Sequence, residues 1–182
     1  MGKIDWKHIK LVATFTEKGV AAEVTKEPTS KWKKTMLLSE HSPIRTETIT
    51  LGVECPYFVH TQLVRHKVGV DFFVASARPD INKEAVPRDR QKKADPCRML
   101  VHANLQAWLN ISRKRLCQKA EKATREVWGA LVDSIRKAEP ELAECCVPEC
   151  VYRGFCPESS KRSCGYHKSK EFKQALDNYR KV

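Results

Sequence analysis

The stretch from Pro56 to Arg78 most constrains the fold of this chain, because it sets a dense group of hydrogen-bonding side chains between two apolar runs. The first run, residues 57–59, is strand-like, and the second run ends near Ser76. Four strong hydrogen-bonding side chains lie between the runs: Gln62, Arg65, His66 and Lys67. One interpretation is a segment that binds a ligand. The other is a solvent-exposed amphipathic helix over residues 60–67 with its two aliphatic residues turned inward.

The histidine of this stretch lies between two cationic neighbours, Arg65 and Lys67. Adjacent positive charges disfavour the addition of a third one. We therefore expect His66 to serve as a hydrogen-bonding or stacking group for an anionic or flat ligand, and not as a general base at neutral pH.

The net charge favours anionic partners. It is +12 with a pI near 9.4, which suits phosphates, nucleotides or nucleic acid. The 182 residues fit one domain spanning residues 1–182, and a hydrophobic content of 41% argues against global disorder. The sequence has neither a signal-peptide layout nor an apolar run of roughly 20 residues, so we expect a cytoplasmic protein with no membrane partner.

Hydrophobic periodicity predicts a mixture of strands and helices. Residues 9–15 are typical of a first strand, and residues 46–51 alternate with the period of two that a strand requires. Residues 123–137 and 168–180 predict two later helices.

The segment over residues 79–96 is rich in charge and proline and predicts a long surface loop. Arg88 and Arg90 are its residues best suited to hold a phosphate, because guanidinium groups bind oxyanions in bidentate fashion. The alternative is that both arginines are simply solvated.

Residues 97–119 predict a long helix without Gly or Pro. Four residues recur at spacings of four, three and four along one stripe: Asn104, Trp108, Ile111 and Arg115. A buried Asn and Arg need polar partners, which a ligand could provide. Alternatively, these two residues lie at the two wet ends of an otherwise apolar face.

Five of the eight cysteines fall within a tail over about residues 145–167. Cys150, Cys156 and Cys164, followed by His167, could form a tetrahedral structural zinc site, although the CxxC pairs typical of such sites are missing. Free thiols or a disulfide between neighbouring loops are the alternatives. The sequence also lacks GxGxxG and P-loop motifs, so it does not predict nucleotide binding through a glycine loop.

Two separate motifs together resemble the flavin-dependent thymidylate synthases, the ThyX family. The family hallmark is RHR, then seven residues, a serine, and an arginine two residues later. This chain has Arg65-His66-Lys67, then eight residues, Ser76 and Arg78, with Gln62 ahead of the motif. The second motif has its counterparts at the family's spacing throughout, namely Asn104, Asn110, Arg115, Leu116 and Arg125.

The resemblance implies a ThyX-like α/β (α+β) fold, with a central, mostly antiparallel sheet flanked by helices and a Cys-rich C-terminal extension. It also implies a homotetramer that binds FAD and dUMP at sites shared between subunits. The family transfers a methylene group from methylenetetrahydrofolate to C5 of dUMP, with NADPH reducing the flavin. The implied FAD contacts are Arg65, His66, Lys67, Asn104 and Asn110. The implied dUMP contacts are Gln62, Ser76, Arg78 and Arg88, and Arg115 would polarise the uracil ring.

The chain also departs from the family pattern. Lys67 stands in place of an arginine, one extra residue precedes Ser76, and Phe72, Pro79 and Gln106 replace the usual asparagine, tyrosine and arginine. These departures fall mostly on the flavin-contacting segment. A second hypothesis is therefore a non-catalytic nucleotide-binding protein on the same scaffold. Sequence-independent binding of nucleic acid through the net charge is a weaker third hypothesis.

Overall fold

A small antiparallel sheet forms the centre of the structure, a computed structural model that describes residues 3–21, 23–87 and 89–181. Its strands are β1 (Thr48–Pro56), β2 (Val70–Val74) and β3 (Pro96–Asn104), in the order β1-β3-β2. Both neighbours of β3 run antiparallel to it, and Val101 lies opposite Leu51 on one side and Phe72 on the other. The strand predicted over residues 46–51 is confirmed, and it extends to Pro56.

Strand β3 corrects the prediction of a single helix over residues 97–119. Alternate residues of β3 are buried, namely Cys97, Met99, Val101 and Ala103. This period of two is the pattern of a strand with one buried face. The segment lacks Gly and Pro, which is compatible with a helix, but its alternation of buried and exposed residues favours a strand. The helix α4 (Leu105–Arg115) begins only after β3 ends.

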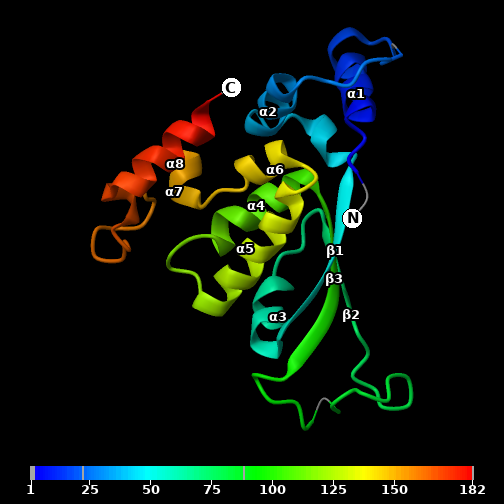
Figure 1. Cartoon of the computed structure of the whole chain (residues 1–182), viewed down its shortest axis with the longest axis vertical. Coiled ribbons are helices and arrows are strands. Elements are labelled where there is room, and N and C mark those ends of the chain that lie inside the picture. The colour runs from blue at the N-terminus through cyan, green and yellow to red at the C-terminus, as the bar shows by residue number, and fades with distance from the viewer. Residues whose placement is uncertain (1–2, 22, 88, 182) are drawn as a thin grey trace.

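Three helices cover one side of the sheet: α3 (Tyr57–Leu63), α4 and α5 (Lys122–Arg136) (Figure 1). In the core, the rings of Trp108 on α4 and Trp128 on α5 stack with centroids 4.9 Å apart. The Trp128 Nε1 donates to the buried Ser112 Oγ at 2.9 Å, so α4 and α5 are joined by a satisfied polar contact. The helix predicted over residues 123–137 is confirmed. The strand-like run at residues 57–59 is instead the first turn of α3.

The N-terminal segment forms α1 (Trp6–Lys18) and α2 (Ser30–Leu38), followed by the short 3₁₀ helix η1 (Ser42–Arg45). The prediction of a strand over residues 9–15 is wrong. Asp5 caps α1 by accepting from the His8 backbone N–H, and the buried residues Trp6, Ile9 and Ala13 recur at helical spacing. Gly19 is the left-handed residue that ends this helix.

The C-terminal segment contains α6 (Pro140–Cys145), α7 (Glu149–Arg153), η2 (Tyr166–Lys168) and α8 (Lys170–Arg180). The predicted final helix is thus confirmed. It packs Phe172 against Cys150 and Val151 in a second, smaller core. The Cys-rich tail is therefore a folded extension beside the main body (Figure 1). Within the described residues, no helix is both long and apolar enough to cross a lipid bilayer.

Candidate functional site

The two sequence motifs meet in space at Arg115, in the last turn of α4. The Arg115 Nε donates to the Nε2 of His66 at 3.0 Å, and its Nη2 donates to the backbone carbonyl of Gln62. These partners are 49 and 53 residues away along the chain. They come within reach because α3 ends at the fully buried Leu63 and the chain then turns back, with the His66 N–H donating to the Leu63 carbonyl at 3.1 Å. The structure thus brings together three predicted site residues.

His66 is neutral at this site. Burial lowers its pKa from 6.5 to about 4, with help from the positive charges of Arg115 and Lys114. Because Nε2 accepts from Arg115, the ring proton of neutral His66 is assigned to Nδ1. The expectation that His66 does not act as a base therefore agrees with its environment. The main cause is burial, however, and the cations that act on it belong to α4 and not to its immediate chain neighbours.

Arg115 remains charged while half-buried. Burial and the nearby Arg65 lower its pKa, yet a guanidinium keeps its proton at neutral pH. Two of its five N–H donors are used by His66 and Gln62, and the others have no hydrogen-bond acceptor among the described residues, so they are available to a ligand. This is a fixed, positively charged fork on a partly desolvated surface, suited to an acceptor oxygen or a carbonyl that gains negative charge.

Arg65 and Lys67 lie on the exposed turn beside this fork. Neither forms an ion pair with any residue that the structure describes. Their side chains are therefore available to an anionic ligand, and the sequence-based assignment of these residues to ligand binding stays a prediction. The substitution of Lys for Arg at position 67 retains the charge but not the bidentate geometry.

Asn104 has a local structural role. Its Oδ1 accepts from the Ala107 N–H at 2.9 Å and caps α4, and its backbone N–H donates to the Gly69 carbonyl at 2.9 Å. Gly69 has a φ of 70°, and a Cβ at this position would lie 2.6 Å from the Asn104 Nδ2. The half-buried side chain of Asn104 thus packs closely against Gly69 at the junction of β3 and α4. Asn104 lies at the start of α4, which agrees with the alternative that places it at one end of the apolar stripe.

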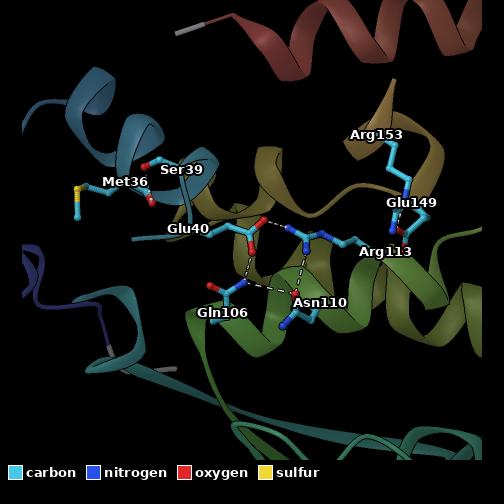
Figure 2. A network of polar contacts seen from close by, with 8 residues as sticks. All are labelled: Met36, Ser39, Glu40, Gln106, Asn110, Arg113, Glu149 and Arg153. Carbon is cyan, nitrogen blue, oxygen red and sulfur yellow. Dashed lines mark hydrogen bonds and ion pairs between the residues drawn. The ribbon is translucent and has the colours of Figure 1, made fainter. Parts of the chain in front are cut away.

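Asn110 belongs to a different side of α4. At about 100° per residue it lies away from the stripe that carries Trp108 and Arg115. Figure 2 shows it in a network with Gln106, Arg113 and Glu40. Sequence reasoning missed Glu40 and Arg113, although the spacing of Gln106, Asn110 and Arg113 by four and three residues predicts a shared helix face.

Ser76 lines a cleft of about 430 Å³ at the point where β2 ends and β3 begins. The cleft is also lined by Asn82, Arg98 and two stacked rings of α3, Tyr57 and His60, whose centroids are 5.6 Å apart. Sequence reasoning did not single out these four residues. Arg98 is engaged by two carboxylates, those of Glu54 at 2.7 Å and Glu84 at 3.5 Å.

The other predicted nucleotide residues that the structure describes lie outside this cleft. Arg78 lies outside the cleft lining and pairs with Asp80 at 2.5 Å, while its backbone N–H donates to the Ser76 Oγ at 3.2 Å. Gln62 and Arg115 do not line the cleft either. Arg90 is exposed in the predicted loop, and Arg88 lies outside the described residues. Within one chain, the described nucleotide residues therefore fall into two groups: Gln62 lies at the Arg115 fork, whereas Ser76 lines the cleft and Arg78 lies next to Ser76.

The predicted zinc ligands Cys150, Cys156 and Cys164 are free thiols that range from buried to exposed. Among the described residues, no three His, Cys, Asp or Glu side chains are placed to hold a metal ion. Burial raises the pKa of the Cys150 thiol to about 11, with smaller contributions from Cys117 and Cys156. A thiol of this kind is protonated at neutral pH and packs as an apolar group. The structure therefore gives the zinc prediction no support.

The fold is similar to that of a known nucleotide methylase. A crystal structure of the UMP/dUMP methylase PolB from Streptomyces cacaoi, bound with 5-Br dUMP, superposes with a TM-score of 0.61 and 13% sequence identity. The match covers 84% of this chain and 92% of that chain. At this identity the likeness shows the fold, and it confirms the predicted fold class of an antiparallel sheet flanked by helices. No family model matches the sequence, and no curated protein is significantly similar to it.

Proposed function

We propose that this chain is a flavin-dependent thymidylate synthase-like enzyme that transfers a one-carbon group to C5 of dUMP or a related pyrimidine deoxynucleotide. The observation that carries the proposal is the contact of Arg115 with His66 and Gln62, because two motifs recognised separately in the sequence meet at one charged fork. The fold likeness to a UMP/dUMP methylase crystallised with 5-Br dUMP supports the same class of substrate.

In this proposal Arg115 stabilises the pyrimidine ring as it gains negative charge. The guanidinium is held in place by two protein acceptors, so its remaining donors need little reorganisation. Neutral His66 orients the guanidinium without adding a competing positive charge. Ser76 in the cleft and the adjacent Arg78 are proposed to contact the nucleotide phosphate, for which Arg78 must leave its exposed partner Asp80.

The residues that would hold FAD fit it in part. Arg65 and Lys67 provide exposed cations for its phosphates, and Asn110 provides an exposed amide. Asn104 does not fit this role as placed, because its side-chain oxygen already caps α4. A bound flavin would supply hydride for the reduction of the transferred carbon, with NADPH and methylenetetrahydrofolate as co-substrates. We include a homotetramer in the proposal, since sites shared between subunits would unite the two groups of nucleotide residues.

The test is turnover with purified protein. We expect a flavin absorption band and formation of dTMP from dUMP, methylenetetrahydrofolate and NADPH. Arg115→Ala should abolish product formation, whereas Arg136→Ala, which removes an exposed arginine of α5 that pairs with Asp133, should not. A protein that shows no flavin band and gains no thermal stability from added FAD would contradict the proposal.

The capping role of the Asn104 side chain favours a second candidate, a non-catalytic nucleotide-binding protein that does not bind FAD. On this alternative dUMP raises the melting temperature and FAD does not, because only a ligand of the folded state stabilises it. Tight binding of FAD would exclude the second candidate.

A further inference from the structure

Glu40 occupies a backbone position that favours glycine. Its φ is 52°, and it is the one non-glycine residue with a positive φ among those that the structure describes. It closes α2 in a Schellman motif, in which the Glu40 N–H donates to the Leu37 carbonyl and the His41 N–H donates to the Met36 carbonyl, both at 3.3 Å. Glycine adopts this left-handed conformation at the lowest cost. A glutamate at this position therefore indicates that its side chain has a role that glycine could not fill.

The Glu40 carboxylate binds two donors from α4. Its Oε2 accepts from the Gln106 Nε2 at 2.5 Å, and its Oε1 accepts from the Arg113 Nη2. The side chains of Glu40 and Arg113 are 23% and 13% exposed, so this ion pair is largely shielded from water. Arg113 is also held from its other side, with its guanidinium 3.5 Å from the ring centroid of Tyr152. Glu40 thus fixes two side chains that point along one face of α4.

Both fixed side chains donate to the same atom of Asn110. The Asn110 Oδ1 accepts from the Gln106 Nε2 at 3.3 Å and from the Arg113 Nη1 at 3.0 Å. Glu40, Gln106, Asn110 and Arg113 therefore form a closed ring of hydrogen bonds (Figure 2). With two donors facing the Oδ1, the amide of Asn110 has one favoured orientation. Its Nδ2 points out of the ring, and no acceptor for it is found among the described residues.

The geometry points to Glu40 as a positioning residue, which orients the exposed Asn110 amide through Gln106 and Arg113 so that its Nδ2 donates to an acceptor oxygen of FAD. This inference rests on the proposed function, in which Asn110 contacts the flavin. Glu40 itself does not touch the ligand. The positioning role explains why a glutamate stands at a glycine-favouring position, because glycine would remove the carboxylate that organises the ring.

Glu40→Gly separates this role from a purely structural one. The substitution relieves the backbone strain and removes the carboxylate, so the two effects on stability oppose each other. A residue that only ties α2 to α4 predicts an unchanged dissociation constant for FAD, whichever way the melting temperature moves. A positioning residue predicts weaker FAD binding whatever the melting temperature.

The experiment is an FAD titration of five proteins, followed by flavin fluorescence. They are the wild type, Glu40→Gly, Asn110→Ala, the double variant and the control Glu144→Gln, which removes a carboxylate that pairs with Lys34 of α2 at 2.6 Å and leaves the ring intact. Asn110→Ala should weaken binding about tenfold, the effect of losing one hydrogen bond. Glu40→Gly should weaken FAD binding nearly as much as Asn110→Ala does, and the double variant should bind FAD no more weakly than Asn110→Ala alone. Glu144→Gln should bind as the wild type does.

Additive losses in the double variant, or an unchanged dissociation constant in Glu40→Gly, would overturn the inference. The conservative Glu40→Gln keeps one acceptor oxygen and should restore part of the affinity lost in Glu40→Gly.

A measurement without FAD distinguishes this inference from the proposed function. The side-chain amide signal of Asn110 is assigned by its loss in Asn110→Ala, and its mobility is compared in the ligand-free wild type and Glu40→Gly by ¹⁵N relaxation. Greater mobility in the variant supports the positioning role of Glu40. Equal mobility refutes it. A wild type that binds no FAD refutes the proposed function and the ligand assigned to Asn110, even where the relaxation data support the ring.

Discussion

Because His66 is neutral in the folded state, we expect the stability of the protein to fall in mild acid. The folded chain holds the pKa of this imidazole at about 4, below the ordinary value of 6.5 that it recovers on unfolding. As the pH falls below about 6.5, the unfolded state therefore takes up a proton that the folded state refuses. The contribution of His66 to stability is complete above that pH and is lost progressively as the pH falls toward the folded pKa.

The magnitude follows from the two pKa values. Between about pH 7.5 and about pH 5 the full shift would reduce the free energy of unfolding by about 2 kcal/mol. His66 is only half-buried, so solvent screening reduces this to about 1 kcal/mol. Burial is the main reason why protonation is costly, and the hydrogen bond from Arg115 adds to it, since the accepting Nε2 would become a donor facing a cation.

The assay is urea unfolding followed by tryptophan fluorescence at both pH values. Gln at position 66 accepts a hydrogen bond through its side-chain oxygen and does not titrate, so His66→Gln should lose about 1 kcal/mol less stability than the wild type on acidification. The exposed His8 on α1 provides the control, and His8→Gln should keep the wild-type pH dependence. The reasoning fails where His66→Gln and the wild type respond equally, or where the His66 ring titrates near 6.5 by NMR.

Two further substitutions probe the geometry around the same site. Arg115→Lys keeps the charge but cannot supply a fork to two protein acceptors and a ligand, so kcat/KM should fall about 100-fold or more. Arg136→Lys, at an exposed position, serves as the control. A fall of kcat/KM under about threefold in Arg115→Lys would contradict the role of the fork. Gly69→Ala should lower the free energy of unfolding by about 1–3 kcal/mol, because φ is positive and the new Cβ would meet Asn104. Urea unfolding against Gly129→Ala, whose Cβ meets nothing within 4 Å, checks this, and equal stability of the two variants would refute it.

The sequence predicted the fold class through its resemblance to a known family, and it selected the residues that form the central contact as candidates. Period-two alternation over residues 46–51 predicts β1, and the apolar spacing over residues 123–137 predicts α5, because both patterns are local. The spacing within the two motifs is sufficient to select His66 and Arg115 as functional candidates. Local patterns also mislead, as at α1, where the cap supplied by Asp5 and the burial of Trp6 against the rest of the protein favour a helix.

Only the tertiary structure decided what each candidate touches. Arg115 reaches Gln62 and His66 because α3 ends on a buried leucine and the chain reverses there, which no spacing along the sequence specifies. The low pKa of His66 arises from burial that depends on the packing of α4. Glu40 escaped notice because its partners lie 66 and 73 residues away and meet it only through the left-handed turn after α2. Hydrogen-bond partners, burial and electrostatic environment are properties of neighbours in space, and the fold alone determines those neighbours.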